Sequence, residues 1–154
     1  MSEYEDKLKQ YLSDNNIDAE FLDLGQSCHT VQDAADSVGA DVDEIIKNIC
    51  LVDSEGNFIV GIVKGAHRVS TKRVAKIMGV ESARTATPEE ILQNSGYPVG
   101  GVPSFGFEAH FLVDPKVMER EAVYSSGGSP TSLLKVSTKI LLEESKGKLV
   151  RIRK

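Results

Sequence analysis

The stretch YPVGGVPSFG, residues 97–106, holds three of the thirteen glycines and two of the five prolines of the chain. Glycine reaches positive φ and lets another backbone or a ligand approach closely, whereas proline fixes φ and lacks an N–H donor. A loop that alternates the two is stiff and presents bare amides, which suits a cradle for an anion or a carbonyl group. The simpler interpretation is a tight connection between two elements.

Two further features favour the cradle. A second glycine-containing stretch, YSSGGS, occupies residues 124–129, and Lys47 stands between apolar residues at positions 45, 46 and 49. The ammonium of a lysine in an apolar setting is either buried at a functional site or reaches the surface while its methylene groups pack along apolar neighbours. We predict that the two glycine loops and Lys47 converge on one pocket.

The helices are predicted from apolar residues at helical spacing, flanked by capping residues and glycine. Thr30, Ser70 and Thr87 are the expected N-caps of three of them, and Pro88 with two glutamates strengthens the third start. A short helix over residues 44–48 would carry Lys47. The expected helices cover residues 3–15, 31–38, 44–48, 71–78, 88–95 and 138–145.

The strands are predicted from short runs rich in β-branched residues. Residues 49–52 and 58–63 are joined by the turn DSEGN and form an expected hairpin. Further strands are expected at residues 19–24, 80–83, 109–113, 122–125, 132–136 and 148–152. Helices and strands are mixed without regular alternation, so we predict an α+β fold, in which one domain over residues 1–154 has a mixed, curved sheet flanked by short helices.

Composition narrows the function classes. A chain of 154 residues is long enough for one core, and no apolar run approaches the length of a membrane span. The acidic N-terminus lacks the regions of a signal peptide, and two cysteines, Cys28 and Cys50, make no disulfide framework. These features predict a cytoplasmic protein without a membrane partner.

Charge is distributed unevenly along the chain. The net charge is −5, but residues 1–62 hold 14 of the 23 acidic residues and only 3 of the 18 basic ones. Five basic residues fall between positions 64 and 76 without an acidic one: Lys64, Arg68, Lys72, Arg73 and Lys76. Such a cluster either contacts a few phosphates or forms a solvated helix face.

Several segments, taken in order, resemble one known family. Residues 30–39 (TVQDAADSVG), 46–52 (IKNICLV), 65–75 (GAHRVSTKRVA), 96–103 (GYPVGGVP) and 124–128 (YSSGG) match the motifs of the YbaK/ProX family in order and spacing. This family comprises stand-alone aminoacyl-tRNA deacylases related to the editing domain of bacterial prolyl-tRNA synthetases. The resemblance covers about residues 17 to 145 and implies the family's α+β fold.

The resemblance also implies a reaction, the hydrolysis of the ester that joins an amino acid to the 3′-terminal ribose of tRNA. Lys47 and Gly101 are then the expected catalytic residues, where the Lys47 ammonium polarises the carbonyl and neutralises phosphate or ribose oxygens, or the neutral amine acts as a base. Substrate-binding residues are expected at Thr30, Gly100, Val102, Pro103, Ser104, Ser126, Gly127 and Gly128. Arg68, Lys72 and Arg73 are expected to contact the tRNA acceptor stem.

We therefore predict a deacylase that acts in trans on mischarged tRNA, with tRNA for proline carrying alanine, cysteine or serine as the expected substrate. The expected partners are aminoacyl-tRNA and prolyl-tRNA synthetase; no cofactor and no metal are expected, and the oligomeric state is open. Two departures concern the amino-acid pocket: the family often has proline where this chain has Ser104, and some members have an aromatic residue where it has Thr30.

Other catalytic arrangements are poorly supported by the sequence, and two other functions remain open. Cys28 and His29 are sequence neighbours whose side chains diverge on most backbones, and the histidines lack metal-ligand spacing. Ser104 lacks the strand–serine–helix context of a serine hydrolase. The alternatives are a non-catalytic module that binds tRNA ends or a synthetase, and a hydrolase of another small acyl or nucleotide ester.

Overall fold

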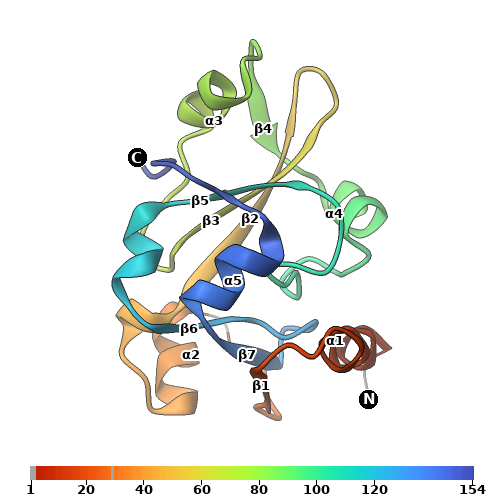
Figure 1. Cartoon of the computed structure of the whole chain (residues 1–154), viewed down its shortest axis with the longest axis vertical. Helices are drawn as coiled ribbons and strands as arrows, with labels where there is room; N and C mark the ends of the chain where they lie inside the picture. Colours follow the sequence, from red (N-terminus) through yellow and green to blue (C-terminus); the bar gives the residue numbers. More distant parts are fainter. Residues whose placement is uncertain (1–2, 29) are drawn as a thin grey trace.

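The computed structural model describes residues 3–28 and 30–154 (Figure 1). Thr30, Ser70 and Thr87 cap their helices as predicted, since each side-chain oxygen accepts a hydrogen bond from the backbone N–H of the residue three positions later. The α-helices are α1 (Glu3–Asp14), α2 (Val31–Val38), α3 (Thr71–Met78), α4 (Pro88–Ser95) and α5 (Thr138–Ser145); two short 3₁₀ helices are η1 (Val42–Glu44) and η2 (Pro115–Glu119).

The strands fall into two sheets. The larger has the order β4-β2-β3-β5-β8 and is mixed, because β2 is antiparallel to β3 and β4 whereas β5 is parallel to β3 and β8. The smaller is antiparallel, with the order β1-β7-β6. The strands are β1 (Ala19–Asp23), β2 (Ile46–Asp53), β3 (Phe58–Lys64), β4 (Ala83–Thr85), β5 (His110–Val113), β6 (Ala122–Ser126), β7 (Ser132–Ser137) and β8 (Lys148–Leu149). The predicted α+β fold with a mixed sheet and short helices is confirmed.

One element was predicted wrongly. Residues 44–48 do not form a helix, because the capping box of Asp41 and Glu44 closes only one 3₁₀ turn and the chain then enters β2. Seven consecutive residues of β2 pair with β3, and cross-strand pairing of β-branched side chains outweighs the helical spacing of the isoleucines. Lys47 therefore lies on a strand, opposite Val63.

Two strand boundaries also differ from the prediction. The strand expected at residues 80–83 begins at Ala83, because the Val80 N–H is still bonded to the Ala75 carbonyl at the end of α3. The last strand ends at Leu149, and residues 150–154 continue as an extended segment toward α3.

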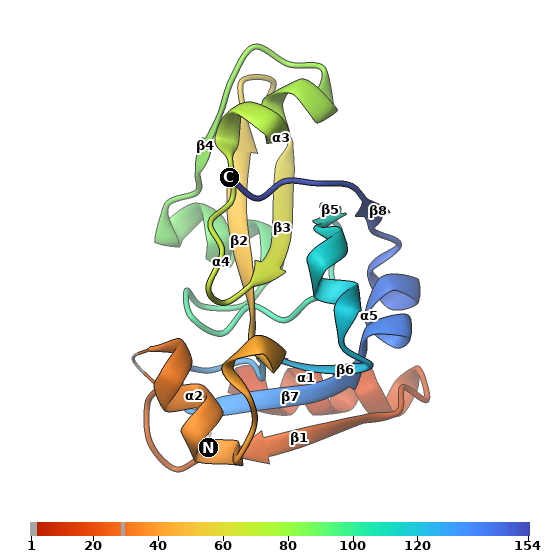
Figure 2. The same cartoon turned by 90° about the vertical axis from the view of Figure 1, so that its left-hand side faces the viewer.

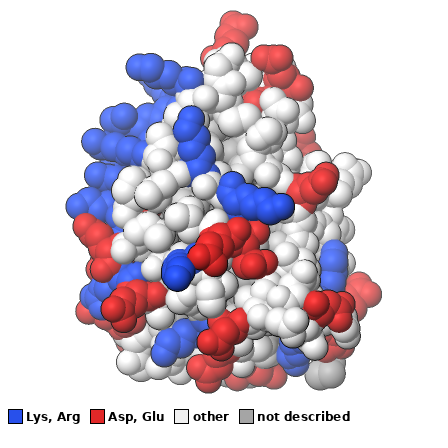
Figure 3. Space-filling model, in the orientation of Figure 1, with Lys and Arg blue, Asp and Glu red and all other residues white. Residues whose placement is uncertain are grey.

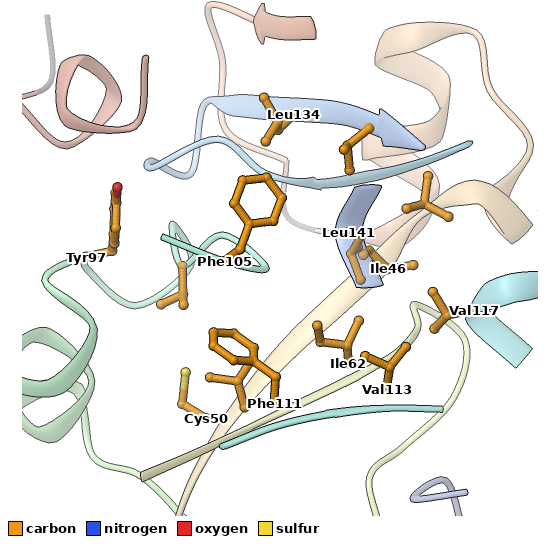
Figure 4. Packing of buried hydrophobic residues seen from close by; sticks show 14 of the residues in the cluster. Ile46, Cys50, Ile62, Tyr97, Phe105, Phe111, Val113, Val117, Leu134 and Leu141 are labelled. Atoms are coloured by element: carbon orange, nitrogen blue, oxygen red, sulfur yellow. The ribbon is translucent and has the colours of Figure 1, made fainter. Parts of the chain in front are cut away.

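The side chains of β2 alternate between two hydrophobic clusters. Ile46 and Cys50 face the space between the two sheets, where Figure 4 shows them with Phe105, Phe111 and Leu134. Leu51 belongs to the cluster on the other face of the larger sheet, under α3. In Figure 2 the β2–β3 hairpin stands upright above the smaller sheet, whose strands run across it. The start of β2 thus lies where the two sheets meet, and Ile45 forms an isolated bridge with Tyr124 of β6.

Candidate active site

A cavity of about 300 Å³ lies along the open edge of β2. β4 pairs only with residues 51–53 of β2, so the preceding residues of that edge have no strand beside them. The loop after α4 and the end of β6 close the space. Its lining consists of Ile46, Lys47, Asn48, Ile49, Cys50, Thr85, Ile91, Val99, Gly100, Val102 and Ser126.

The backbone of β2 takes part in this lining. The Cys50 carbonyl accepts a hydrogen bond from the Ala86 N–H, which shows that Cys50 directs its backbone groups away from β3. In an antiparallel ladder this direction alternates from residue to residue. The backbone N–H and C=O of Asn48 therefore point toward the same open edge as those of Cys50.

Lys47 is partly buried and lines the cavity. Burial lowers the pKa of its ammonium below the ordinary lysine value, and the positive charge of Arg68 lowers this pKa further. The predicted convergence of Lys47 with the first glycine loop is observed, because Gly100 and Val102 line the same space. A cation and bare backbone that line the same cavity can together stabilise a developing oxyanion.

The first glycine loop contains a tight turn. The Gly101 N–H donates to the Pro98 carbonyl over 2.9 Å, and Gly100 has φ +83°, a conformation that favours glycine. The Gly101 N–H is thus already used in this turn. Within the described part of the chain, the N–H groups of Gly100 and Val102 donate no hydrogen bond, and both residues line the cavity.

The two glycine loops touch each other. A Cβ on Gly101 would lie 2.6 Å from the backbone carbon and oxygen of Gly128, so only glycine fits there without movement of the backbone. Gly128 has φ +96° and itself lies against the Tyr4 backbone of α1. Gly127 donates its N–H to the Ser132 carbonyl within the hairpin. The second loop supplies Ser126 to the cavity lining, while Gly127 and Gly128 are buried against neighbouring backbone.

A hydrogen-bond network supports the loop from β2. The Asn48 side-chain amide donates to the Val102 carbonyl over 2.8 Å and to Ser125 Oγ over 2.9 Å. Ser104 Oγ donates to Asn48 Oδ1 over 2.8 Å and lies 2.9 Å from Ser125 Oγ. Sequence reasoning missed Asn48 and Ser125. Assigning Lys47 to a strand would have placed the adjacent Asn48 on the opposite face, toward the glycine loop.

The remaining expected site residues lie outside the cavity lining. Ser104 is fully buried in the network just described, and Pro103 is buried next to it. Thr30 is exposed, and its hydroxyl is used to cap α2. Arg68, Lys72 and Arg73 are exposed at the start of α3 and in the loop before it. His29 lies outside the described residues, so its relation to Cys28 is not part of the structure.

A wider hollow of about 950 Å³ lies elsewhere, between α1, the β2–β3 turn and the end of α5. It contains none of the expected site residues, and its lining includes three glutamates, Glu108, Glu143 and Glu144, against one lysine, Lys146. Carboxylates there would repel the phosphates of a nucleic acid, so the smaller cavity is the better candidate. The described residues contain no group of three or more potential metal-ligating side chains. No helix within residues 3–28 and 30–154 is long and apolar enough to cross a bilayer.

Residues 26–143 match the family model of the aminoacyl-tRNA editing domain. The chain belongs to this family. The YbaK-type resemblance predicted from the motifs is thereby confirmed, and the matched range contains Lys47 and both glycine loops.

Two relatives with curated sequences illustrate the range of the editing-domain family. Uncharacterized protein YwhH of Bacillus subtilis (strain 168) is 25% identical over 136 residues, which cover 87% of this chain and 86% of that protein. Proline--tRNA ligase of Trichlorobacter lovleyi is 27% identical over 84 residues, which cover 54% of this chain but only 15% of the ligase. The chain thus corresponds to a small part of the ligase and to most of YwhH.

Solved structures agree with this assignment. A crystal structure described as a candidate trans-editing enzyme for prolyl tRNA synthetase superposes with a TM-score of 0.92 and 25% identity, covering all of this chain and 99% of the other. The hypothetical protein APE2540 gives a TM-score of 0.87 at 25% identity and covers 96% of this chain and 99% of the other. Both similarities extend over nearly the whole chain.

Proposed function

We propose that this editing-domain protein is an aminoacyl-tRNA deacylase that acts in trans and hydrolyses the ester of mischarged tRNA. The observation that supports the proposal is that Lys47, Gly100, Val102 and Ser126 line one cavity, while the N–H groups of Gly100 and Val102 donate no hydrogen bond within the described residues. The ester is already an activated bond, so an enzyme needs to hold it, position a water molecule and stabilise the oxyanion.

We assign a different task in this reaction to each residue of the cavity lining. The Lys47 ammonium and the amides of Gly100 and Val102 would bind the oxygen on which negative charge develops when water attacks the carbonyl. The Ser126 hydroxyl is available to the ribose or the α-amino group. Burial raises the pKa of the Cys50 thiol to about 12, so it stays protonated near neutral pH. An uncharged thiol is a poor nucleophile, which favours direct attack by water.

The size and polarity of the cavity bear on the substrate. A volume of about 300 Å³ must hold the aminoacyl group and part of the ribose, and the walls include Ile46, Ile49, Ile91 and Val99. A small, largely apolar space favours a small amino acid such as alanine or cysteine. Because the sequence relatives include prolyl-tRNA synthetases, we propose tRNA for proline as the carrier and the synthetase as a partner that produces the mischarged substrate.

The test is deacylation of tRNA for proline charged with alanine, cysteine, serine or proline. We expect hydrolysis of a small non-cognate ester and little hydrolysis of the prolyl ester. Lys47→Ala should lower the rate about 10²–10³-fold, the range seen when one oxyanion-stabilising group is lost. Lys139→Ala, an exposed lysine on α5, is the matched control and should keep the full rate.

Two results would overturn the proposal. A wild-type protein that binds tRNA without accelerating hydrolysis of any of the four esters is a binding module. A protein that hydrolyses small acyl esters equally well without an RNA body is a different hydrolase. Equal rates for Lys47→Ala and the wild type would remove the assigned role of Lys47.

A further inference from the structure

The C-terminal segment, residues 150–154, lies outside the part of the chain that matches the family and carries Arg151, Arg153 and Lys154. It crosses the face of the larger sheet that α3 covers, where Ile152 lies against Gly61 of β3, and runs beside the loop that precedes α3. The Ser70 N–H donates to the Ile152 carbonyl, and the Lys154 N–H donates to the Arg68 carbonyl over 2.8 Å. The last residues of the chain are therefore hydrogen-bonded beside the basic cluster of residues 68–76.

This segment is fixed by two buried groups. Ile152 is fully buried in the cluster under α3. Asp114, also fully buried, accepts hydrogen bonds from the N–H groups of Ile152 and Arg153 and from the Arg153 guanidinium at 2.8 Å. Arg153 is thus neutralised by Asp114, whereas Arg151 and Lys154 on either side of it are exposed.

The result is a basic surface built from two distant parts of the chain. Figure 3 shows Lys and Arg side chains gathered at the upper left, where Figure 1 places α3 and the C-terminus. Glu81 is the acidic residue nearest the end of α3, in a shallow hollow with Lys72 and Lys76. Within the described part of the chain, six exposed cations of this surface form no ion pair: Arg68, Lys72, Arg73, Lys76, Arg151 and Lys154.

Net charge makes this gathering significant. The chain carries −5 overall, yet six unpaired cations share this one face, so an anionic partner is attracted to this face rather than to the rest of the surface. The surface also reaches the candidate active site, because Arg68 lies close enough to Lys47 to act on its charge. A partner that spans both must carry several regularly spaced negative charges and end in a group small enough for the cavity.

We propose that the C-terminal segment and α3 form one phosphate-binding surface for the backbone of an RNA helix whose 3′ end enters the cavity at Lys47. In taking that RNA to be the one that carries the ester, the inference rests on the proposed function. Arg151 and Lys154 add contacts beyond those expected from Arg68, Lys72 and Arg73. Residues 150–154 form the second side of this phosphate-binding surface, beside α3, and the hydrogen bonds to Asp114 hold them in place.

The test measures RNA binding separately from catalysis. The probe is a non-acylated RNA hairpin that reproduces an acceptor stem with a 3′ CCA end, and its affinity is measured by fluorescence anisotropy over a series of KCl concentrations. The double variant Arg151→Gln/Lys154→Gln removes two exposed cations. The matched control, Lys9→Gln/Lys139→Gln, removes two exposed cations from α1 and α5.

We expect the C-terminal variant to bind the hairpin at least tenfold more weakly at low salt. The slope of log K against log [KCl] should become shallower by about 1.5, since each phosphate contact contributes roughly 0.7–0.9. The control should keep the wild-type affinity and slope. If both double variants behave like the wild type, the C-terminal segment is not part of the surface and the inference is wrong.

Deacylation of the acylated hairpin separates this inference from the proposed function. If both hold, the C-terminal variant raises KM and leaves kcat unchanged, because it removes binding that is equal in the ground and transition states. Normal turnover with an unchanged KM leaves the deacylase standing and overturns the surface. The opposite result is also informative. If hairpin binding depends on salt and weakens in the variant, but the wild type hydrolyses no ester, the proposed phosphate-binding surface is supported and the proposed deacylase function is wrong.

Discussion

At the scale of single residues, the candidate site depends on the charge state of Lys47. Burial is the main cause of its lowered pKa, and Arg68 is the second. A lowered pKa gives Lys47 a larger fraction of neutral amine at any given pH than an exposed lysine has. Electrostatic stabilisation and base catalysis therefore call for different protonation states of the same group.

The pKa of Lys47 can be measured directly. In protein with ¹³C-labelled lysine ε-carbons, we expect one resonance, absent in Lys47→Ala, to titrate below the exposed lysines. Arg68→Gln should raise this pKa, because removal of a neighbouring positive charge favours the protonated form, yet the pKa should stay below that of exposed lysines because burial persists. A Lys47 resonance that titrates with the exposed lysines would contradict the electrostatic picture.

A second prediction at the scale of single residues concerns the substitution Gly101→Ala. Gly101→Ala places a Cβ 2.6 Å from the Gly128 backbone, which cannot rotate away as a side chain could. We expect a loss of about 1–3 kcal/mol in the free energy of unfolding, typical of overpacking, together with reduced deacylation. Urea denaturation measures the first quantity. Val99→Ala, an exposed neighbour in the same loop, should change stability by less than about 0.5 kcal/mol.

At the scale of elements, β2 positions most of the candidate site. One face of the strand contributes Ile46 and Cys50 to the core between the sheets, and its open edge lines the cavity. Asn48 connects this strand to the glycine loop and to β6 through three side-chain hydrogen bonds. The cavity thus depends on rigid strands on one side and on two glycine loops on the other.

The position of the C-terminal segment depends on hydrogen bonds to Asp114. Burial alone would raise the pKa of Asp114, but hydrogen bonds from Lys116, Arg153 and Ile152 outweigh it and lower this pKa. Asp114→Ala removes the acceptor from three backbone amides, those of Lys116, Ile152 and Arg153, and from one guanidinium. We expect a loss on the order of 2–4 kcal/mol in stability and faster amide hydrogen exchange at residues 152–154. Asp18→Ala, far along the chain before β1, is the control and should leave exchange at the C-terminus unchanged.

At the scale of the whole molecule, ion pairs join β3 of the larger sheet to both 3₁₀ helices, η1 and η2. Lys64 of β3 is buried and pairs with Asp43 at 2.9 Å and with Glu119 at 2.7 Å. The hydrogen bond from Lys64 lowers the pKa of Asp43, and Lys64 and Lys116 lower that of Glu119. Burial would lower the pKa of Lys64, but its two carboxylate partners outweigh burial and raise it.

These shifts predict how stability depends on pH. The folded pKa values of Asp43, Asp114 and Glu119 lie below their unfolded values, so their contribution is present above about pH 4 and is lost as pH falls through the folded values. The contribution of Lys64 is present below its unfolded pKa and is lost as pH rises through the raised value. Urea denaturation at pH 7, 4 and 3 should show falling stability. Asp43→Asn should make this fall shallower; an equal or steeper fall would contradict the assignment.

The sequence predicted the parts of the site better than their arrangement. Lys47, part of the first glycine loop and Ser126 of the second line one cavity, and their roles stay a prediction. A lysine among isoleucines and the glycine pairs were local signals of burial or of unusual backbone. Asn48 and Ser125 gave no such signal. Their importance comes from hydrogen bonds between residues 54 to 77 positions apart, which no local pattern encodes.

By itself, the sequence determined the family, the helix caps and the residues at which the backbone turns, since each of these depends on side chains within a few positions of one another. Only the tertiary structure decided that residues 46–53 form a strand, because pairing with β3 outweighs the local helical spacing. It likewise decided that Ser104 is buried and that Lys154 lies beside Arg68. Contacts between distant segments settle such features, and these contacts form only when the two sheets and the C-terminal segment pack together.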